Sequence, residues 1–496
     1  MPSLTTADWI ARAAALSPRR DAFIGGRFVP AASGARFVTT SPRDGSALAE
    51  IASCDTEDVD RAVRSAHTAF LAGDWSEADP AHRKAVLLRF ADLIDEHTEE
   101  LALLETLDVG KPIGDTLAVD VPKTARAIRW YAEAIDKTYD EIAPAPRSAL
   151  ALVTREPLGV IGAVVPWNYP LMIASWKLGP ALATGNSVVL KPAEDSTLSA
   201  LLLAELGSRA GLPDGVFNVV PGFGAVTGQA LGRHELVAKI AFTGSPAVGR
   251  EFLRYAADSN GKQVALELGG KSPQVVLDDC KDVAAASSAV TWGIYYNAGQ
   301  TCNAGSLLVT TPRVREELLE RIASDTKAFT VGDPLDPATQ VGPLVSAKQH
   351  ERVTSYFPIA ESEGGRYVVG GPDPEASGTY VAPTVIDGVA ADARVAQEEV
   401  FGPVLVHLAA RDTEEAVALA NGTRYGLAAS VWTGDVSTAH RVARKLRAGT
   451  VWVNTFDASD VITPFGGFGD SGSGRDKSLH ALDAYTALKT TWINLA

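Results

Sequence analysis

Residues 159–166 read GVIGAVVP, a short run of glycine and β-branched residues that ends at a proline. Helical segments follow it, such as 196–210 and 225–231, and they alternate with further short apolar runs. Strands that alternate with helices predict a parallel, doubly wound sheet. The other β-rich runs of this region are NSVVLKP (186–192), VFNVVPG (216–222), KIAFTG (239–244) and QVALELGG (263–270).

The same alternation continues outside this region. Apolar residues at helical spacing predict helices over about 81–107 and 124–135, and the turn residues of 370–378 predict a surface loop. A chain of 496 residues is too long for one ordinary core, so we expect two or more domains. The second α/β set comprises SLLVTT (306–311), a helix at 314–324, VLVHLAA (404–410), a helix at 413–420 and GTVWVN (449–454).

The composition argues against several classes of protein. A net charge of -15 without a long Lys/Arg run argues against a nucleic-acid partner. Three scattered cysteines suggest a reducing compartment, and none of the eight histidines has metal-ligand spacing. The longest near-apolar run, 158–167, is too short to cross a bilayer, and the N-terminus lacks the features of a signal peptide. We therefore expect a soluble, cytoplasmic protein with no membrane partner and no metal site.

Three turns that follow predicted strands are candidate nucleotide contacts. GFGAVTG (222–228) is one residue too long for the G-x-G-x-x-G fingerprint, and a tight strand-to-helix turn explains it equally well. In FTGSPAVGR (242–250), Gly244 and Ser245 come just before a helix start, where backbone N–H groups can face a diphosphate, although a plain glycine turn is the alternative.

KPAE (191–194) ends another strand of the same sheet. There Lys191 and Glu194 could meet a nucleotide ribose. A carboxylate at that point accepts from both ribose hydroxyls and repels a 2′-phosphate, which favours NAD over NADP. The alternative is a solvated ion pair in a loop.

Cys302 is the candidate nucleophile. It stands in NAGQTCNAG (297–305), where small neighbours let backbone and substrate approach closely. A thiolate is the reactive form of cysteine. The alternative is a structural cysteine, because no nearby His or Asp completes a familiar dyad.

Three polar residues accompany it as candidates. Glu267 lies between two leucines in LELGGKSP (266–273), and apolar company raises a carboxyl pKa toward that of a general base. Asn168, held between aromatics and prolines in PWNYP (166–170), could donate to a developing oxyanion. Glu399 lies beside the turn of EEVFGPV (398–404). The alternatives are an exposed edge-strand Glu, a turn-capping Asn and a solvated surface carboxylate.

These motifs occur together in an order that resembles the aldehyde dehydrogenase superfamily. The resemblance covers about residues 23–492 and is carried by PWNYP, KPAE, FTGSPAVG, LELGGKSP, GQTC, EEVFGPV and PFGGFGDSGSGR. It implies a homodimer or homotetramer of α/β fold. The implied parts are a Rossmann-like NAD-binding domain (1–139 and 159–267), an α/β catalytic domain (268–470) and a small β oligomerisation arm (140–158 and 471–496). The family's cofactor fold is a variant, so the missing fingerprint is no objection.

The resemblance also implies roles for single residues. Cys302 matches the nucleophile and Glu267 the general base. Asn168 matches the oxyanion-hole amide, which acts with the Cys302 N–H, and Lys177 matches a residue near the proton-release path. The implied contacts to NAD, with NADP as the alternative, are Val165, Trp167, Lys191, Glu194, Gly224, Phe242, Gly244, Ser245, Val248, Leu268, Glu399 and Phe401.

The implied reaction needs no metal. Cys302 adds to an aldehyde, a hydride leaves for the nicotinamide, and Glu267 activates the water that hydrolyses the thioester. One residue departs from the family pattern: Gly469 stands where many members have a lysine, which puts a local surface contact in doubt.

The loop TFDASDVITP (455–464) bears on the substrate, because in this family it helps line the substrate mouth. Carboxylates there could hold the cationic end of an ω-aminoaldehyde, while a solvated loop is the alternative. IRWYAEAIDK (128–137) and GRDKSLHALDAYTALKTTWI (474–493) resemble the γ-glutamyl-γ-aminobutyraldehyde dehydrogenases of polyamine catabolism. The candidate substrate residues are Asp120, Tyr169, Trp176, Phe456, Asp457, Asp460 and Phe465. The alternatives are a betaine or broad aliphatic aldehyde dehydrogenase, and a cofactor-independent thioester or ester hydrolase.

Overall fold

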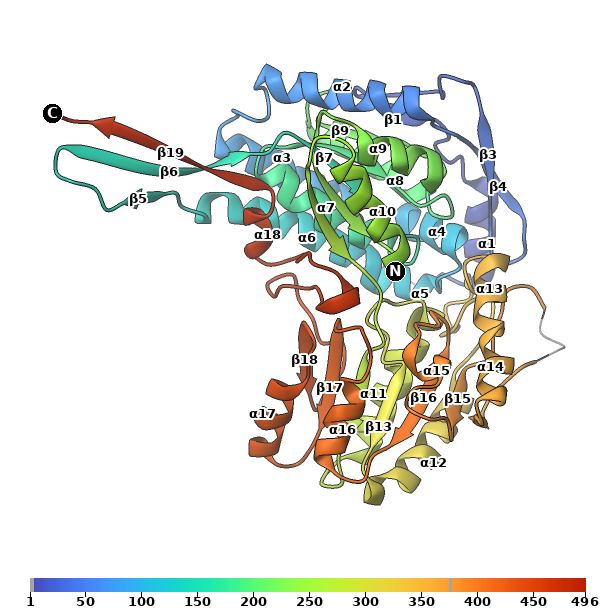
Figure 1. Ribbon diagram of the computed structural model, residues 1–496. Helices are drawn as coiled ribbons and strands as arrows, with labels where there is room; N and C mark the ends of the chain where they lie inside the picture. The colour runs from blue at the N-terminus through green and yellow to red at the C-terminus, as the bar shows by residue number, and fades with distance from the viewer. Residues whose placement is uncertain (1–3, 374–376) are drawn as a thin grey trace.

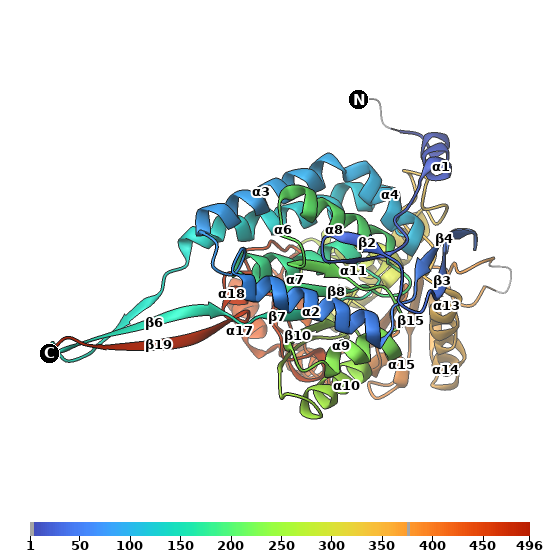
Figure 2. The same ribbon diagram turned by 90° about the horizontal axis from the view of Figure 1, so that it is seen from above.

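The computed structural model describes residues 4–373 and 377–496. Two seven-stranded sheets build two lobes, and a three-stranded sheet projects from the first lobe as an arm (Figures 1 and 2). The α/β fold with parallel sheets expected from the sequence is confirmed.

The first sheet has the order β11-β10-β7-β8-β9-β1-β2, with β7 to β11 parallel and β1 and β2 antiparallel at the far edge. All five residues of β7 are buried, because helices cover both faces of the sheet. A parallel strand in that position is apolar along its whole length and does not alternate between apolar and polar residues. The strands are β1 (Ala22–Ile24), β2 (Arg27–Val29), β7 (Val160–Val164), β8 (Ser187–Lys191), β9 (Phe217–Val219), β10 (Val237–Thr243) and β11 (Gln263–Glu267).

Each face of this sheet carries its own apolar core. α2, α9 and α10 pack on one face, and α3, α4, α6, α7 and α8 contribute to the core on the other. The helices of this lobe are α1 (Thr6–Ala15), α2 (Thr56–Ala72), α3 (Pro80–Glu96), α4 (Thr98–Val109), α5 (Ile113–Asp115), η1 (Thr116–Asp120), α6 (Val121–Ala134), η2 (Ile135–Lys137), α7 (Pro170–Ala183), α8 (Leu198–Ala210), η3 (Gly224–Gly228), α9 (Gln229–Arg233) and α10 (Pro246–Ala257). A two-stranded ribbon joins β3 (Arg36–Thr40) to β4 (Ala47–Ala52).

The second sheet has the order β14-β15-β16-β13-β12-β17-β18, parallel except for the β14–β15 pair. Its strands are β12 (Pro273–Val276), β13 (Leu307–Thr310), β14 (Arg366–Val369), β15 (Thr384–Asp387), β16 (Val404–Ala409), β17 (Ala428–Trp432) and β18 (Thr450–Val453). Its helices are α11 (Val283–Tyr295), η4 (Tyr296–Gly299), α12 (Pro312–Ala328), α13 (Ala347–Thr354), α14 (Tyr356–Ser362), α15 (Arg394–Gln397), α16 (Thr413–Ala420), α17 (Val436–Lys445) and η5 (Gly469–Ser471). The last short helix, α18 (His480–Asp483), packs against α7 and joins the core of the first lobe. Within 4–373 and 377–496, no helix is long and apolar enough to cross a membrane.

The arm consists of β5 (Glu141–Ala143), β6 (Ala149–Pro157) and β19 (Thr486–Asn494), in the order β19-β6-β5. β6 and β19 pair antiparallel along nine residues and extend away from the body in both views (Figures 1 and 2). Leu488 and Trp492 on β19 are more than half exposed. The domain bounds stay a prediction: residues 472–476 lie against the first sheet, and the arm strand starts only at Thr486.

Two predicted helices differ from the structure. The helix expected over 81–107 is two helices that break at His97, whose φ is -102° and ψ is 20°. α4 is buried all round from Leu101 to Val109 whereas α3 buries one face, so the chain must turn to bring α4 into the core. The helix expected at 225–231 begins as the π-helix η3. In the loop predicted at 370–378, residues 374–376 lie outside the described part.

Candidate active site

Cys302 lies in the turn between η4 and β13, where the two lobes meet. Three consecutive residues just before it, Asn297, Ala298 and Gly299, have φ values of 51°, 52° and 72°. A left-handed Ala costs free energy, and it persists only where the surroundings fix it. Asn297 supplies that restraint: its Nδ2 donates to the carbonyl oxygens of Asn168 at 3.1 Å and of Gln300 at 3.2 Å. The turn therefore holds the cysteine at a fixed position.

Asn168 belongs to the same hydrogen-bond network. It is buried in the turn between β7 and α7, and its Nδ2 donates to the Gln300 carbonyl at 2.9 Å. A side-chain amide has two N–H donors. The second has no acceptor among the described residues, so this amide is fixed in place with one hydrogen left to donate.

Burial raises the pKa of the Cys302 thiol, and the negative charges of Glu399, Glu267 and Asp457 raise it further. The resting group is therefore a thiol, and its proton must leave as the sulfur attacks. This setting suits a cysteine that is activated only when an electrophile arrives.

Glu267 ends β11 at the edge of the first sheet, yet it is only 4% exposed. Residues of the chain's C-terminal part cover it: Glu267 forms a bridge with Gly472, and a Cβ at Gly474 would lie 2.9 Å from its Oε1. Both carboxylate oxygens lack a hydrogen-bond partner among the described residues. The alternative of an exposed edge-strand glutamate is therefore wrong.

Burial raises the pKa of Glu267 well above its ordinary value, and the nearby Asp476 raises it further. The positive charges of Lys177 and Arg475 act in the opposite direction. Lys177 Nζ donates to Asp476 Oδ2 at 2.5 Å, and both side chains are nearly inaccessible to solvent. The predicted Lys177 thus lies in a buried ion pair whose two charges shift the pKa of Glu267 in opposite directions.

Glycines allow the catalytic segments to touch. A Cβ at Gly270 would lie 2.6 Å from the Cys302 carbonyl oxygen, closer than real Cβ atoms approach. The LELGG motif therefore packs directly against the cysteine turn.

We expect Gly270→Ala to lower kcat/KM by about 10²-fold, because the added methyl group must push the Cys302 backbone away. Gly114→Ala is the matched control, since a Cβ there meets only the Pro337 carbonyl oxygen at an ordinary 3.7 Å. Steady-state kinetics together with melting curves of both variants test this. Wild-type kinetics in a folded Gly270→Ala enzyme would contradict it.

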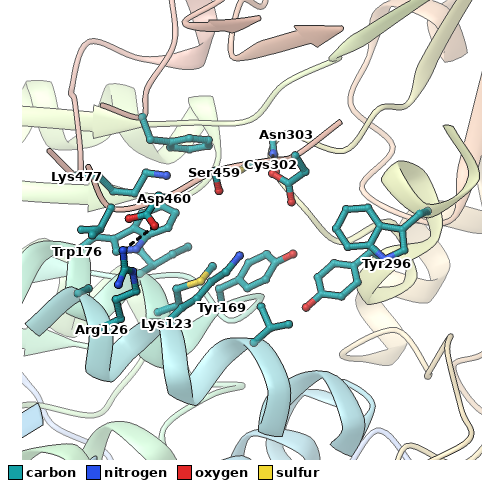
Figure 3. Close-up of a pocket in the computed structure, with 18 residues that line it drawn as sticks. Lys123, Arg126, Tyr169, Trp176, Tyr296, Cys302, Asn303, Ser459, Asp460 and Lys477 are labelled. Atoms are coloured by element: carbon teal, nitrogen blue, oxygen red, sulfur yellow. Dashed lines mark hydrogen bonds and ion pairs between the residues drawn. The ribbon is translucent and has the colours of Figure 1, made fainter. Parts of the chain in front are cut away.

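A cavity of about 200 Å³ opens at Cys302 (Figure 3). Five aromatic side chains line it: Tyr169, Trp176, Trp292, Tyr296 and Phe465. Five charged side chains also line it: Lys123, Arg126, Asp457, Asp460 and Lys477. The cavity therefore combines an apolar wall with a charged part.

Two predicted substrate residues do not reach this cavity. Asp120 is fully buried, and its carboxylate accepts from Lys111 Nζ at 2.5 Å. Phe456 packs against Trp452, with ring centroids 4.9 Å apart. Both substrate contacts stay predictions, because in this structure each side chain has a partner in the interior instead. The other predicted substrate residues, Tyr169, Trp176, Asp457, Asp460 and Phe465, do line the cavity.

Sequence reasoning missed several lining residues, Lys123, Arg126, Trp292, Tyr296 and Lys477 among them. The i, i+3 spacing of Lys123 and Arg126 and the i, i+4 spacing of Trp292 and Tyr296 place each pair on one helix face. That spacing could have grouped the pairs, but it does not reveal what the face meets.

Several predicted cofactor residues lie at the carboxyl ends of β7, β8 and β10, and none of the predicted cofactor residues lines the cavity at Cys302. Lys191 is buried at the end of β8, where Nζ lies 3.2 Å from Glu194 Oε2, and burial lowers its pKa. Ser245 is the N-cap of α10 and accepts from the Val248 N–H at 3.4 Å. Val248 and Gly224 lie on the surface beside it, whereas Val165, Phe242 and Leu268 are buried.

The EEVFGPV segment reaches the same region from the second lobe. Glu399 Oε1 accepts from the Gly270 N–H at 2.8 Å, and burial raises the pKa of Glu399 to about 7. A Cβ at Gly269 would lie 2.1 Å from Glu399 Oε2, so this contact needs glycine. Phe401 has a φ of 63° and packs edge-on against Trp167, with ring centroids 5.4 Å apart. The structure thus brings Trp167, Glu399 and Phe401 together.

The departure at Gly469 has a backbone cause. Its φ is 60°, and a Cβ there would lie 2.5 Å from the Arg424 carbonyl oxygen. A lysine at this position would need a different turn.

Comparison with known proteins agrees with this geometry. The model of the aldehyde dehydrogenase family matches residues 28–491. The aminoacetaldehyde dehydrogenase of Pseudomonas aeruginosa is 50% identical over 99% of both chains. The solved indole-3-acetaldehyde dehydrogenase of P. syringae, in complex with NAD+ and IAA, is 53% identical with a TM-score of 0.98, covering 99% of this chain and 100% of its own.

A third relative has a different substrate in its name. The solved γ-glutamyl-γ-aminobutyraldehyde dehydrogenase of Burkholderia cenocepacia is 52% identical with a TM-score of 0.97, covering 99% of this chain and 100% of its own. With a family match across nearly the whole length and a cysteine, a buried glutamate and an amide assembled between two α/β lobes, the chain belongs to the aldehyde dehydrogenase family.

Proposed function

We propose that this protein oxidises an aldehyde to the carboxylic acid with NAD as the cofactor, through a thioester on Cys302. The observation that carries the proposal is the position of Cys302 at the end of an aromatic cavity, joined to Asn168 through Gln300 and near the buried Glu267. The candidate cofactor residues lie outside this cavity, which leaves it free for the substrate.

The residues at the carboxyl edge of the first sheet fit a dinucleotide. The N-terminus of α10 offers N–H groups to a diphosphate, and Lys191 with Glu194 offers partners to a ribose. Phe223, Val226 and Val248 are each nearly half exposed beside them, an apolar surface suited to a base. Bound NAD would supply a hydride acceptor. Glu194 favours NAD over NADP, because it would repel a 2′-phosphate.

The chain's own groups perform the remaining steps. The sulfur of Cys302 bonds to the aldehyde carbon as its proton passes to a solvent water, while the free N–H of Asn168 and the Cys302 N–H stabilise the oxyanion. Loss of hydride leaves a thioester. The Glu267 carboxylate then takes a proton from water, whose oxygen attacks the thioester, and the acid leaves as the thiol is restored.

We expect Lys177→Met to shift the pH dependence of kcat to higher pH, by about one unit. Only the unprotonated Glu267 can accept a proton, so the rate rises with pH through its pKa, and removing the positive charge of Lys177 raises that pKa. The matched variant Asp476→Asn removes a charge of opposite sign and is expected to shift the profile to lower pH. Deacylation rates measured across pH test both, and shifts of the same sign would contradict this assignment.

For the substrate, we propose an aldehyde derived from an amine: an ω-aminoaldehyde or its γ-glutamyl derivative. The names of two relatives and the charged residues in the cavity support this. The test is NADH formation from 4-aminobutyraldehyde, its γ-glutamyl derivative, betaine aldehyde and propanal. Equal kcat/KM for all four, unchanged in Asp457→Ala and Asp460→Ala, would exclude this substrate class.

Indole-3-acetaldehyde is a second candidate, because two tryptophans, two tyrosines and a phenylalanine line the cavity and one relative carries that name. It belongs in the same assay. A kcat/KM above those of the amine-derived aldehydes would make it the preferred substrate.

We further propose a homodimer or homotetramer that forms through the arm, in a cytoplasmic protein. Leu488 and Trp492 are exposed and lie four residues apart on β19, so both side chains project from the same face of the strand. Two exposed apolar side chains on one face support an interface there. Light scattering of the wild type and of Leu488→Asp tests the assembly.

A further inference from the structure

Two lysines that line the substrate cavity, Lys123 and Lys477, form no ion pair with a described residue, although both lie close enough to Asp457 for their charges to offset part of the rise that burial causes in the pKa of its carboxyl group. Arg126 is paired, since its Nη2 lies 2.7 Å from Asp460 Oδ2. Asp457 is also engaged, because its Oδ1 accepts from Asn303 Nδ2 at 2.8 Å. Lys123 and Lys477 form no hydrogen bond or ion pair with any described residue, and Figure 3 shows both side chains directed into the cavity.

Lys477 is held in a defined position. It is only 4% exposed, and its Nζ lies 5.3 Å from the ring centroid of Trp176 and 5.2 Å from that of Phe465. Its backbone is fixed as well: Lys477 and Ser478 have φ values of 62° and 55°, and the Ser478 N–H donates to the Val461 carbonyl at 2.7 Å. The burial and the two ring contacts therefore place the ammonium group at one end of the cavity, on a backbone that is itself fixed.

The charges of the lining favour an anion. Arg126 and Asp460 neutralise each other, which leaves two ammonium groups facing one carboxylate, Asp457. An entering ammonium would meet two like charges in a partly desolvated cavity, where charge interactions are stronger than in water. A carboxylate would give the lysines their missing partner.

We propose that Lys477 and Lys123 bind a carboxylate at the far end of the substrate; this inference rests on the proposed aldehyde oxidation. The preferred substrates are then aldehydes with a carboxylate tail. Of the two substrates proposed above, this site favours the γ-glutamyl derivative over the ω-aminoaldehyde, which ends in a bare ammonium. An α-amino-acid end, such as that of a γ-glutamyl group, satisfies this site and also offers an ammonium to Asp457.

The test compares three aldehydes of equal chain length: 6-oxohexanoate, hexanal and 6-(trimethylammonio)hexanal, which cannot cyclise. We expect wild-type kcat/KM to be highest for 6-oxohexanoate. In Lys477→Met and in Lys123→Met, kcat/KM for 6-oxohexanoate is expected to fall about 10- to 100-fold, mainly because KM rises. A fall of this size corresponds to the loss of one charge-assisted hydrogen bond. Hexanal is expected to change less than about threefold, because it makes no such bond.

Two controls accompany these variants. Lys137→Met removes the same charge from an exposed lysine near the end of the helix that carries Lys123, and it is expected to leave the substrate order unchanged. Lys477→Arg keeps the charge and is expected to keep the preference. If Lys477→Met does not fold, Lys123→Met still tests the site, because Lys123 is exposed and its replacement is not expected to disturb the core.

A wild-type preference for the trimethylammonio aldehyde, or an unchanged order of substrates in both methionine variants, would overturn the carboxylate site. Continued oxidation of hexanal in those experiments would leave the proposed function intact. Absence of NADH formation from all three aldehydes would instead reject the proposed function.

Discussion

Cys302→Ala is expected to lower aldehyde-dependent NADH formation by about 10⁴-fold or more, because no other group can carry the acyl intermediate. Cys302 is the one cysteine that lines the cavity; Cys54 is buried in the first lobe, and Cys280 lies in the second lobe before α11. The replacement is small and the turn is held by Asn297, so the variant is expected to fold and to bind NAD normally.

Mass spectrometry gives this prediction a direct readout. Wild-type enzyme quenched during turnover is expected to carry the acyl group on the peptide that contains Cys302. Cys280→Ala is the control and is expected to keep wild-type rates. Turnover without any adduct on that peptide, or full activity in Cys302→Ala, would contradict the thioester mechanism.

Glu267→Gln is expected to separate the two halves of the reaction. Acylation needs Cys302 and Asn168 but not Glu267, so about one equivalent of NADH per active site is expected in a rapid burst. Hydrolysis then lacks its base, and steady-state kcat is expected to fall by about 10³-fold. The change is nearly isosteric, and both oxygens of Glu267 lack partners in the described residues, so the fold keeps its hydrogen bonds.

Rapid-quench kinetics and melting curves measure this result. The variant also removes a buried carboxyl group whose pKa is higher in the folded state than in the unfolded state. Such a group makes the folded protein less stable as the pH rises from the unfolded pKa to the folded pKa, because the unfolded chain releases the proton more readily. Glu267→Gln is therefore expected to melt at or above the wild-type temperature at pH 8. Glu251→Gln, on the exposed side of α10, is the control. A slow variant without a burst would mean that Glu267 acts before the thioester forms.

Local sequence singled out the candidates for the catalytic centre, while the family resemblance supplied their roles, which stay a prediction. Cys302, Glu267 and Asn168 each stand in a short motif whose glycines, prolines or apolar neighbours are themselves the signal. Those neighbours do what the pattern suggested: Gly270 allows the LELGG segment to touch the Cys302 carbonyl, and the leucines beside Glu267 are buried.

Sequence reasoning failed where a side chain chose its partner from a distant segment. Lys177, for example, pairs with Asp476, which lies 299 positions further along the chain. Asp120 was expected in the substrate mouth but pairs in the interior with Lys111, a partner only nine positions away that the sequence reasoning did not consider. Lys477 was not singled out, although it lies in the substrate cavity between two aromatic rings. The residues next to a charged side chain in the sequence do not show whether it forms a buried ion pair or contacts a ligand, because both depend on which segments pack against it.

The sequence by itself determined the alternation of strands and helices and the place of the candidate nucleophile in a turn of small residues, because these depend on residues within a few positions of one another. Only the tertiary structure decided which charges face the substrate and what shifts the pKa of Glu267. Both follow from the folding of residues 465–478 back over the first sheet, where Asp476 meets Lys177 and Lys477 meets Trp176. Contacts across 300 residues are fixed by the closing of the two lobes, and no local pattern encodes them.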